Sequence, residues 1–280
     1  MADVLCYGSI CADLRIWLPR WPMPGSGVHA LRSAWSAGGN ALNEARALTW
    51  WGVQPLLYGD RLGDDPAGEV VATELRALNL AANIERDARV ATPVCHILIT
   101  PDGERTIIAL REGTAASPPP PEALAAAQIV SVSRYGLYTT EVALAARRLD
   151  RLVIVGDVLT PTEPLAYAAD VIVTSAALLD PDPLARATDL HYVRGAPVFL
   201  TDGPRPARVF VAGVWYEVLP PVQTVTDSTG AGDIFRAGVT YGVWRGWDWP
   251  AILAFATRAA TEQLTTPPTE GSLRAIRSPV

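Results

Sequence analysis

The strongest constraint on the fold is the alternation of strand-like and helix-like segments in the second half of the chain. Short apolar runs of strand length recur there, and helical patterns separate or follow them. The runs include Ile129–Val132, Leu152–Val155 and Val198–Thr201, with helices predicted over Glu141–Leu149 and Asp248–Leu264. Such alternation is typical of an α/β domain whose mostly parallel sheet carries helices on both faces.

The first half of the chain departs from this alternation. A buried strand is predicted over Val4–Ile10 and a helix over Asn40–Trp51, but about residues 14–35 and 94–110 resemble hairpins. Hairpins do not belong in a parallel sheet, so we expect them to form a small separate sheet that projects from the core. The ligand cleft should then lie at the carboxyl ends of the parallel strands, under the small sheet.

A glycine-rich motif, Thr226-Asp227-Ser228-Thr229-Gly230-Ala231-Gly232-Asp233, is the most informative segment for function. A strand-like segment, Tyr216 to Val225, precedes it, and an apolar run with helical character follows it from Ile234. The first amides of a helix have no internal partner, and the helix dipole adds partial positive charge there. Glycines also let a ligand approach the backbone closely, so the motif predicts a phosphate site.

Asp233 is the unusual member of this motif, because a carboxylate repels a bound phosphate. A site that transfers a phosphoryl group to a hydroxyl needs such a group, since it takes the hydroxyl proton. We therefore interpret Asp233 as a general base. The alternative is a carboxylate at a helix start that only interacts favourably with the dipole.

Composition excludes several kinds of chemistry. All 23 basic residues are arginine, so the chain has no lysine for a P-loop, a Schiff base or a protein-kinase strand. The net charge of −6 argues against a nucleic-acid-binding face. No apolar run reaches the roughly 18–20 residues of a membrane span, and the N-terminus lacks the features of a signal peptide. A cytoplasmic protein without nucleic-acid or membrane partners is expected.

The three cysteines, Cys6, Cys11 and Cys95, have neither a metal-binding spacing nor a disulfide pattern. We interpret them as reduced, buried thiols. A redox-active pair of Cys6 and Cys11 is the alternative.

Four further motifs accompany the glycine-rich one. They are Gly8-Ser9-Ile10-Cys11-Ala12-Asp13, Gly38-Gly39-Asn40-Ala41-Leu42-Asn43, the polar turn Gly59–Gly68, and Thr201-Asp202-Gly203. In this order and spacing, the set resembles the ribokinase-like, or PfkB, family of sugar and nucleoside kinases. The resemblance covers nearly the whole chain.

This resemblance implies a single kinase domain over residues 1–280. The implied fold is three-layer α/β/α, with a mostly parallel central sheet and a small β-sheet lid formed by about 14–35 and 94–110. The implied activity is phosphorylation of a hydroxymethyl group of a small sugar or sugar derivative, with ATP and Mg²⁺. Exposed lid sheets often pair two subunits in this family, so a homodimer through the lid is one expected arrangement.

The resemblance also assigns roles to residues. Asp233 matches the catalytic base, and Gly230, Ala231 and Gly232 match an anion hole whose amides receive charge from the transferred phosphoryl group. Asp13, Gly39 and Asn43 match residues that contact sugar hydroxyls. The residues on the nucleotide side are Thr201, Gly203, Asp227 and Thr229. The alternatives are ordinary turn residues, or, for Asn43, an exposed helix residue.

Two arginines and one missing motif leave questions open. Arg134 follows a strand, where it would meet an anionic acceptor or be a surface residue, and Arg111 would contact substrate or form a lid salt bridge. The family often has Asn-x-x-Glu, associated with Mg²⁺ and phosphate, where this chain has Ser175-Ala176-Ala177-Leu178. The metal ligands therefore stay unassigned, with water, Asp157 or Asp180 as candidates.

Other functions remain to be weighed against a sugar kinase. A nucleoside kinase would use the same fold, and the missing carboxylate favours a non-catalytic sugar or nucleotide sensor. A nicotinamide dehydrogenase is disfavoured, because no G-x-G-x-x-G follows the first strand. The motifs do not identify the acceptor.

Overall fold

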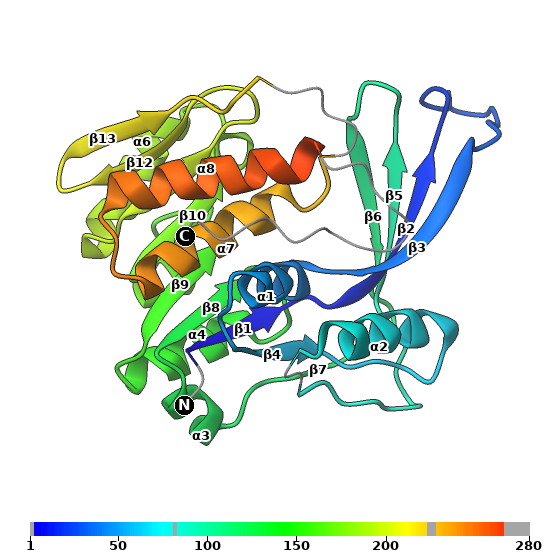
Figure 1. Cartoon of the computed structure of the whole chain (residues 1–280), viewed down its shortest axis with the longest axis horizontal. Coiled ribbons are helices and arrows are strands. Elements are labelled where there is room, and N and C mark those ends of the chain that lie inside the picture. The colour runs from blue at the N-terminus through cyan, green and yellow to red at the C-terminus, as the bar shows by residue number, and fades with distance from the viewer. Residues whose placement is uncertain (1–2, 81–82, 223–227, 266–280) are drawn as a thin grey trace.

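The computed structural model describes residues 3–80, 83–222 and 228–265. A nine-stranded sheet with the order β13-β12-β11-β10-β9-β8-β1-β4-β7 runs through the molecule (Figure 1). Its parallel strands are β1 (Val4–Gly8), β4 (Pro55–Asp60), β8 (Ile129–Ser133), β9 (Leu152–Gly156), β10 (Val171–Ser175) and β11 (Val198–Thr201). Antiparallel strands at the edges are β7 (Ala116–Ser117), β12 (Ala207–Val211) and β13 (Val214–Val218).

Helices cover both faces of this sheet. Strand β1 shows why: Val4 and Cys6 belong to one hydrophobic core, and Leu5 and Tyr7 belong to the other, as the two-residue period of a strand requires. The helices over the first core are α1 (Asn40–Trp50), α2 (Pro66–Leu78), α7 (Ala231–Trp244) and α8 (Trp249–Thr265). Those over the second are α3 (Pro121–Ala126), α4 (Thr139–Arg148), α5 (Pro164–Ala168) and α6 (Pro183–Arg194).

A second, smaller sheet stands beside the large one, on the right in Figure 1. Its order is β3-β2-β5-β6, from β2 (Cys11–Trp17), β3 (Arg32–Gly38), β5 (Val94–Ile99) and β6 (Arg105–Leu110). Strands β2 and β5 are parallel, whereas the two outer pairs are antiparallel. The first predicted hairpin, over about residues 14–35, corresponds to β2 and β3, which begin at Cys11 and end at Gly38.

One local prediction was wrong, and one helix was not predicted. The predicted strand from Tyr216 to Val225 ends at Val218, and residues 223–227 lie outside the described part of the chain. Helix α6 was not predicted, although its capping signals are present in the sequence. Asp182 accepts a hydrogen bond from the Ala185 amide at 3.2 Å, and Gly195 ends the helix with a left-handed conformation.

In the described part of the chain, no helix combines the length and the apolar character needed to cross a bilayer.

Candidate functional site

Helix α7 begins at the glycine-rich motif, after Gly230, which has a φ of 81°. The Ala231 amide donates a long hydrogen bond of 3.5 Å to the carbonyl of Ser228. The amides of Gly232 and Asp233 make no hydrogen bond to any acceptor within the described residues. A Cβ at Gly232 would meet no atom of the described residues within 4 Å, so this part of the chain leaves the space beside Gly232 open. As far as the described residues go, the start of α7 therefore offers unpaired N–H groups to an anion.

The Asp233 carboxylate lies in the first turn of the same helix and is 21% exposed. Its Oδ2 accepts a hydrogen bond from Asn43 Nδ2 at 2.8 Å, and its Oδ1 is 3.8 Å from Arg236 Nη2. Burial raises the pKa of Asp233, while Arg236 and the Asn43 hydrogen bond oppose that rise. A raised pKa makes a carboxylate a better proton acceptor, as a general base requires.

Asn43 is buried, not exposed as one interpretation of the sequence held. Its Oδ1 accepts a hydrogen bond from Arg46 Nη1 at 3.0 Å, which leaves Nδ2 to face Asp233. Arg46 is held in turn by the carbonyl of Ala37 at 3.0 Å and by Glu74 at 2.5 Å. This chain of contacts from α2 through α1 to α7 fixes the orientation of the Asn43 amide.

A buried ion pair lies directly behind Asp233. Arg236 Nε donates to Glu44 Oε2 at 2.8 Å, with only 3% and 1% of these side chains exposed. Glu44 also accepts from Thr240 at 2.7 Å, and Arg236 donates to the carbonyl of Asn40 at 2.9 Å. The pair joins α1, which carries Asn43, to α7, which carries Asp233. The sequence motifs did not predict this ion pair. An arginine in the otherwise apolar run after Asp233 was the available signal.

Asp13 on β2 is 4% exposed. A Cβ on Gly38 would lie 2.0 Å from its Oδ2, so the Asp13 carboxylate occupies the space that a side chain at position 38 would need. Burial raises the pKa of Asp13 to about 6, although Arg15, Cys11 and Arg46 act in the opposite sense. The negative charge of Asp233 raises this pKa further, because the two carboxylates lie close enough to interact electrostatically.

Replacing Asp13 with Asn should change the pH dependence of stability. Because the folded-state pKa of about 6 lies above the ordinary 3.8, the ionised carboxylate destabilises the folded state once the pH exceeds the ordinary value. This destabilisation of the folded state is small near pH 4 and reaches its full size above about pH 7. We therefore expect the stability of Asp13→Asn relative to wild type to increase by about 2 kcal/mol between about pH 4.5 and 7.5. Urea unfolding of both proteins in metal-free buffer measures this stability difference. A stability difference that does not change with pH would contradict the prediction.

The other predicted sugar-side residues have structural partners. Gly39 has a φ of 95°, and a Cβ there would lie 2.3 Å from the carbonyl oxygen of Ser9. Arg111 forms a salt bridge to the buried Asp60 at 2.5 Å and donates to Ser9 Oγ at 3.0 Å. Arg134 Nη1 donates to Glu163 at 2.7 Å. Sugar contacts by these three residues stay predictions.

The predicted nucleotide-side residues lie farther along the sheet. Thr201 ends β11, and Gly203 follows it with a φ of 56°. Strands β8, β9 and β10 separate β11 from β1, which corresponds to roughly 20 Å at about 4.8 Å a strand. Thr229 is buried just before α7. Asp227 lies outside the described residues.

Arg105, which the motifs did not identify, and Asp157, one of the candidate metal ligands, also act on the pKa of Asp233 or respond to its charge. Arg105, the first residue of β6, donates from Nη1 to Ser228 Oγ at 2.5 Å, and its charge lowers the pKa of Asp233. Asp157 follows β9 with a φ of 65°; burial raises its pKa, Arg236 lowers it and the charge of Asp233 raises it. Asp180 is exposed, and no carboxylate occurs in Ser175-Ala176-Ala177-Leu178, which forms the end of β10 and a single 3₁₀ turn.

Known proteins resemble the chain along most of its length. A family model described as pfkB family carbohydrate kinase matches residues 1–275. Ribokinase from Bacillus subtilis is 25% identical over 279 residues, which cover 93% of this chain and 92% of the relative. Acarbose 7(IV)-phosphotransferase from Actinoplanes sp. is 27% identical over 290 residues, or 95% of this chain and 93% of the relative.

A solved structure shows the same fold. Ribokinase from Arabidopsis thaliana, complexed with ribose and ATP, has a TM-score of 0.81 at 22% identity. The match covers 99% of this chain and 96% of that chain. The predicted three-layer α/β/α fold, with its mostly parallel sheet and small second sheet, is confirmed.

Proposed function

The chain belongs to the pfkB family of carbohydrate kinases, and we propose that it transfers phosphate from ATP to a hydroxymethyl group of a small sugar or sugar derivative. One observation carries this proposal: the Asp233 carboxylate is held by Asn43 beside amides at the start of α7 that have no partner among the described residues. A base and an anion site at the same helix start are the two groups that phosphoryl transfer to an alcohol needs.

Asp13 and Asn43 hold the sugar hydroxyls in the proposed mechanism, and the small sheet acts as a lid over them. Asp233 removes the proton of the acceptor hydroxyl as its oxygen attacks the γ-phosphorus of ATP. The bond from this phosphorus to the bridging oxygen breaks, and ADP leaves. The amides of Gly232 and Asp233, at the end of the Gly230–Gly232 turn, stabilise the charge that develops on the phosphoryl oxygens. Lid closure excludes water, which would otherwise accept the phosphoryl group.

The nucleotide is proposed to extend from the start of α7 towards Thr201 and Gly203, at the carboxyl end of β11. Parallel α/β sheets bind ligands outside the carboxyl ends of their strands, which supports this placement. The bound Mg²⁺ would neutralise charge on the nucleotide phosphates. Asp157 is a suitable ligand for it, because it is a half-buried carboxylate close enough to Asp233 for their charges to interact. Mg²⁺ needs only one or two protein carboxylates when phosphate oxygens and waters supply its remaining ligands.

A panel of acceptors tests this function. The purified chain, ATP and Mg²⁺ are incubated separately with ribose, other small sugars, amino sugars, anionic sugars, oligosaccharides and nucleosides, and phosphorylated product is detected by mass spectrometry. We expect product with at least one sugar, and at least about 100-fold slower product formation in an Asp233→Asn control. Product with nucleosides alone would identify a nucleoside kinase. Binding of sugar or ATP without any product would favour the sensor.

Arg105 lies in the small sheet that is proposed to act as the lid, and we expect its side chain to contribute to phosphoryl transfer. The chain has no lysine, and the Arg105 guanidinium lies within electrostatic reach of Asp233. Because a guanidinium stabilises charge on a transferred phosphoryl group, Arg105→Ala should lower kcat by about 10- to 100-fold. Arg105→Lys should recover part of this loss. Arg258→Ala, which removes an exposed arginine of α8, is the matched control. Equal kcat values for Arg105→Ala and the control would contradict the role.

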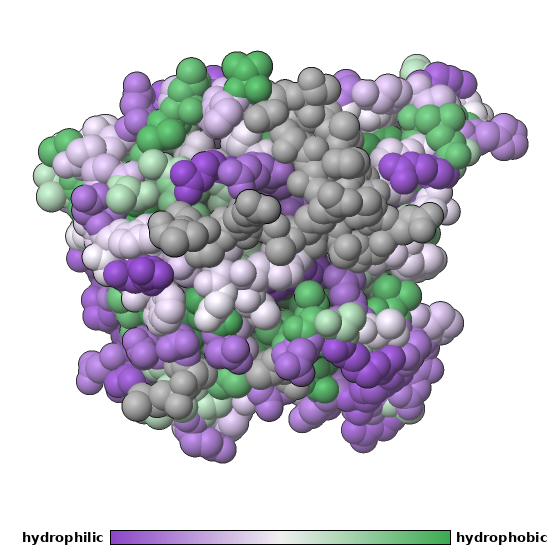
Figure 2. All heavy atoms as spheres, viewed as in Figure 1, coloured by the Kyte–Doolittle hydropathy of each residue, from purple (hydrophilic) through white to green (hydrophobic). Residues whose placement is uncertain are grey.

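The outer face of the small sheet supports the proposed homodimer. The register places Trp35, Leu14, His96 and Ile108 in one row across the four strands, on the face opposite Asp13. Trp35 and Ile108 are exposed, and so is Leu110 of the same face. Apolar side chains are visible on this sheet at the upper right of Figure 2. Light scattering should give a dimer that Trp35→Glu dissociates; a monomeric wild type would contradict the proposal.

A further inference from the structure

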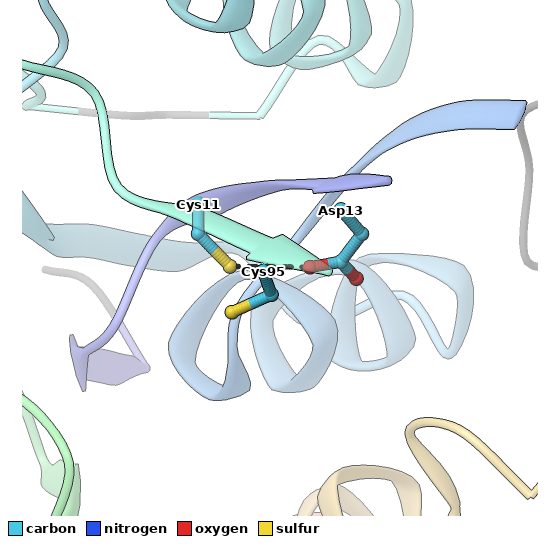
Figure 3. Close-up of side chains that lie close together, drawn as sticks. All are labelled: Cys11, Asp13 and Cys95. Carbon is cyan, nitrogen blue, oxygen red and sulfur yellow. Dashed lines mark hydrogen bonds between the residues drawn. The ribbon is translucent and has the colours of Figure 1, made fainter. Parts of the chain in front are cut away.

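Three potential metal ligands converge on the inner face of the small sheet. Cys11 and Asp13 are two residues apart on β2, so their side chains point to the same face. Cys95 on β5 is paired directly with Asp13 in the register of the parallel strands. The two Sγ atoms and a carboxylate oxygen all lie within 4.8 Å of one another (Figure 3). Among the described residues, this is the one group of three such ligands.

The strand geometry favours a metal ion over a disulfide between the two cysteines. The register pairs Cys95 with Asp13, so Cys11 lies diagonally across the two strands. Diagonal partners in a sheet are about 7–8 Å apart, whereas the Cα atoms of a disulfide are usually about 4.4–6.8 Å apart. A metal ion relaxes this limit, because each sulfur binds it at about 2.3 Å and the ion occupies the space between them.

The ligand chemistry selects the class of metal. Thiolates bind zinc and similar thiophilic cations, whereas Mg²⁺ and Ca²⁺ take oxygen ligands. Two thiolates and one carboxylate carry three negative charges, so a divalent cation leaves one. The charges of Arg15 and Arg46 act on Asp13 and favour its ionised form, and Arg46 also pairs with Glu74. Cys11 and Asp13 are buried, but Cys95 is only partly buried, which leaves the cluster accessible from one side.

We propose that Cys11, Asp13 and Cys95 bind a thiophilic divalent cation of the Zn²⁺ type, with the fourth position taken by water. The two thiols each release a proton when the ion binds. This site is separate from the Mg²⁺ that accompanies the nucleotide. On the proposed function, Asp13 also binds the sugar, so the metal and the sugar compete for one carboxylate. Bound Zn²⁺ is then a reversible inhibitor that acts on the sugar side of the reaction.

Spectroscopy with Co²⁺ tests the site without any use of catalysis. The full chain, reduced by a phosphine, is titrated with Co²⁺, and thiolate-to-cobalt charge transfer is followed in the near ultraviolet. We expect a band that saturates at one equivalent and disappears when Zn²⁺ is added. Cys11→Ser and Cys95→Ser should each lose most of it. Cys6→Ala, which changes the remaining cysteine in β1, should keep it.

The variants must be shown to fold, so their thermal unfolding is compared with wild type. A folded Cys95→Ser protein that keeps the full band would overturn the proposal, and so would a wild-type chain without a band. In the kinase assay, Zn²⁺ should raise the sugar KM of wild type several-fold and leave that of Cys95→Ser unchanged. A band without kinase activity would reject the proposed function alone, whereas kinase activity without a band would reject the metal site alone.

Discussion

Asp233→Asn is expected to lower kcat by about 10²- to 10⁴-fold, the usual contribution of a positioned general base. The substitution preserves shape, and its amide oxygen can still accept the hydrogen bond that Asn43 Nδ2 donates. What it removes is the ability to take a proton from the acceptor hydroxyl. ATP affinity should change little, because the amides at the start of α7 and the proposed nucleotide residues Thr201 and Gly203 are unaltered. Steady-state kinetics and calorimetry with ATP measure the two quantities separately.

A matched variant separates this role from a favourable interaction with the helix dipole. Asp182 lies at the start of α6, where it accepts a hydrogen bond from the Ala185 amide and is exposed. Asp182→Asn removes the same charge at another helix start, so it should leave kcat within a few-fold of wild type. If Asp233→Asn and Asp182→Asn had similar kcat values, Asp233 would be a dipole residue and not a base.

Glu44→Gln is expected to lower the free energy of unfolding by about 3–5 kcal/mol, because it leaves the buried charge of Arg236 without its main partner. The carbonyl of Asn40 and the more distant Asp233 would be the remaining acceptors for that guanidinium. Arg236→Gln should have a comparable effect, since it leaves Glu44 as the unpaired charge. The double variant should cost less than the sum of the two single variants. Urea unfolding of all four proteins gives the coupling free energy.

An exposed pair supplies the comparison. Arg258 and Glu262 on α8 are 3.9 Å apart, and about half of each side chain is exposed. Glu262→Gln should therefore cost no more than about 1 kcal/mol. A similar cost for Glu44→Gln would show that the buried pair does not hold α1 against α7, and the positions of Asn43 and Asp233 would then need another explanation.

The sequence predicted those parts of the molecule that depend on local pattern. Apolar runs and glycines located most strands of the large sheet, and the turn before α7 could be predicted because its glycines and Asp233 are neighbours in the chain. Helix α6 was missed although Asp182 and Gly195 mark its ends. The capping signals of this helix are therefore visible in the sequence itself.

Other features depend on register and packing, which a single sequence does not reveal. Arg105 reaches Ser228, 123 residues away, only because the turn before β6 lies against the start of α7. Cys11 and Cys95 come together because β2 and β5 pair in parallel, whereas hairpins alone were predicted for these segments. Arg46 orients Asn43 through contacts that cross two helices. In each of these cases, tertiary structure creates the contact.

The most direct test is a crystal structure of the chain with ADP, Mg²⁺, aluminium fluoride and a sugar that the acceptor panel identifies. We expect fluoride atoms within about 3 Å of the Gly232 and Asp233 amides. We also expect the acceptor oxygen of the sugar within hydrogen-bonding distance of the Asp233 carboxylate, on the line between that carboxylate and the aluminium. A carboxylate turned away from the sugar, or amides bonded to the chain itself while the fluoride binds elsewhere, would contradict the account.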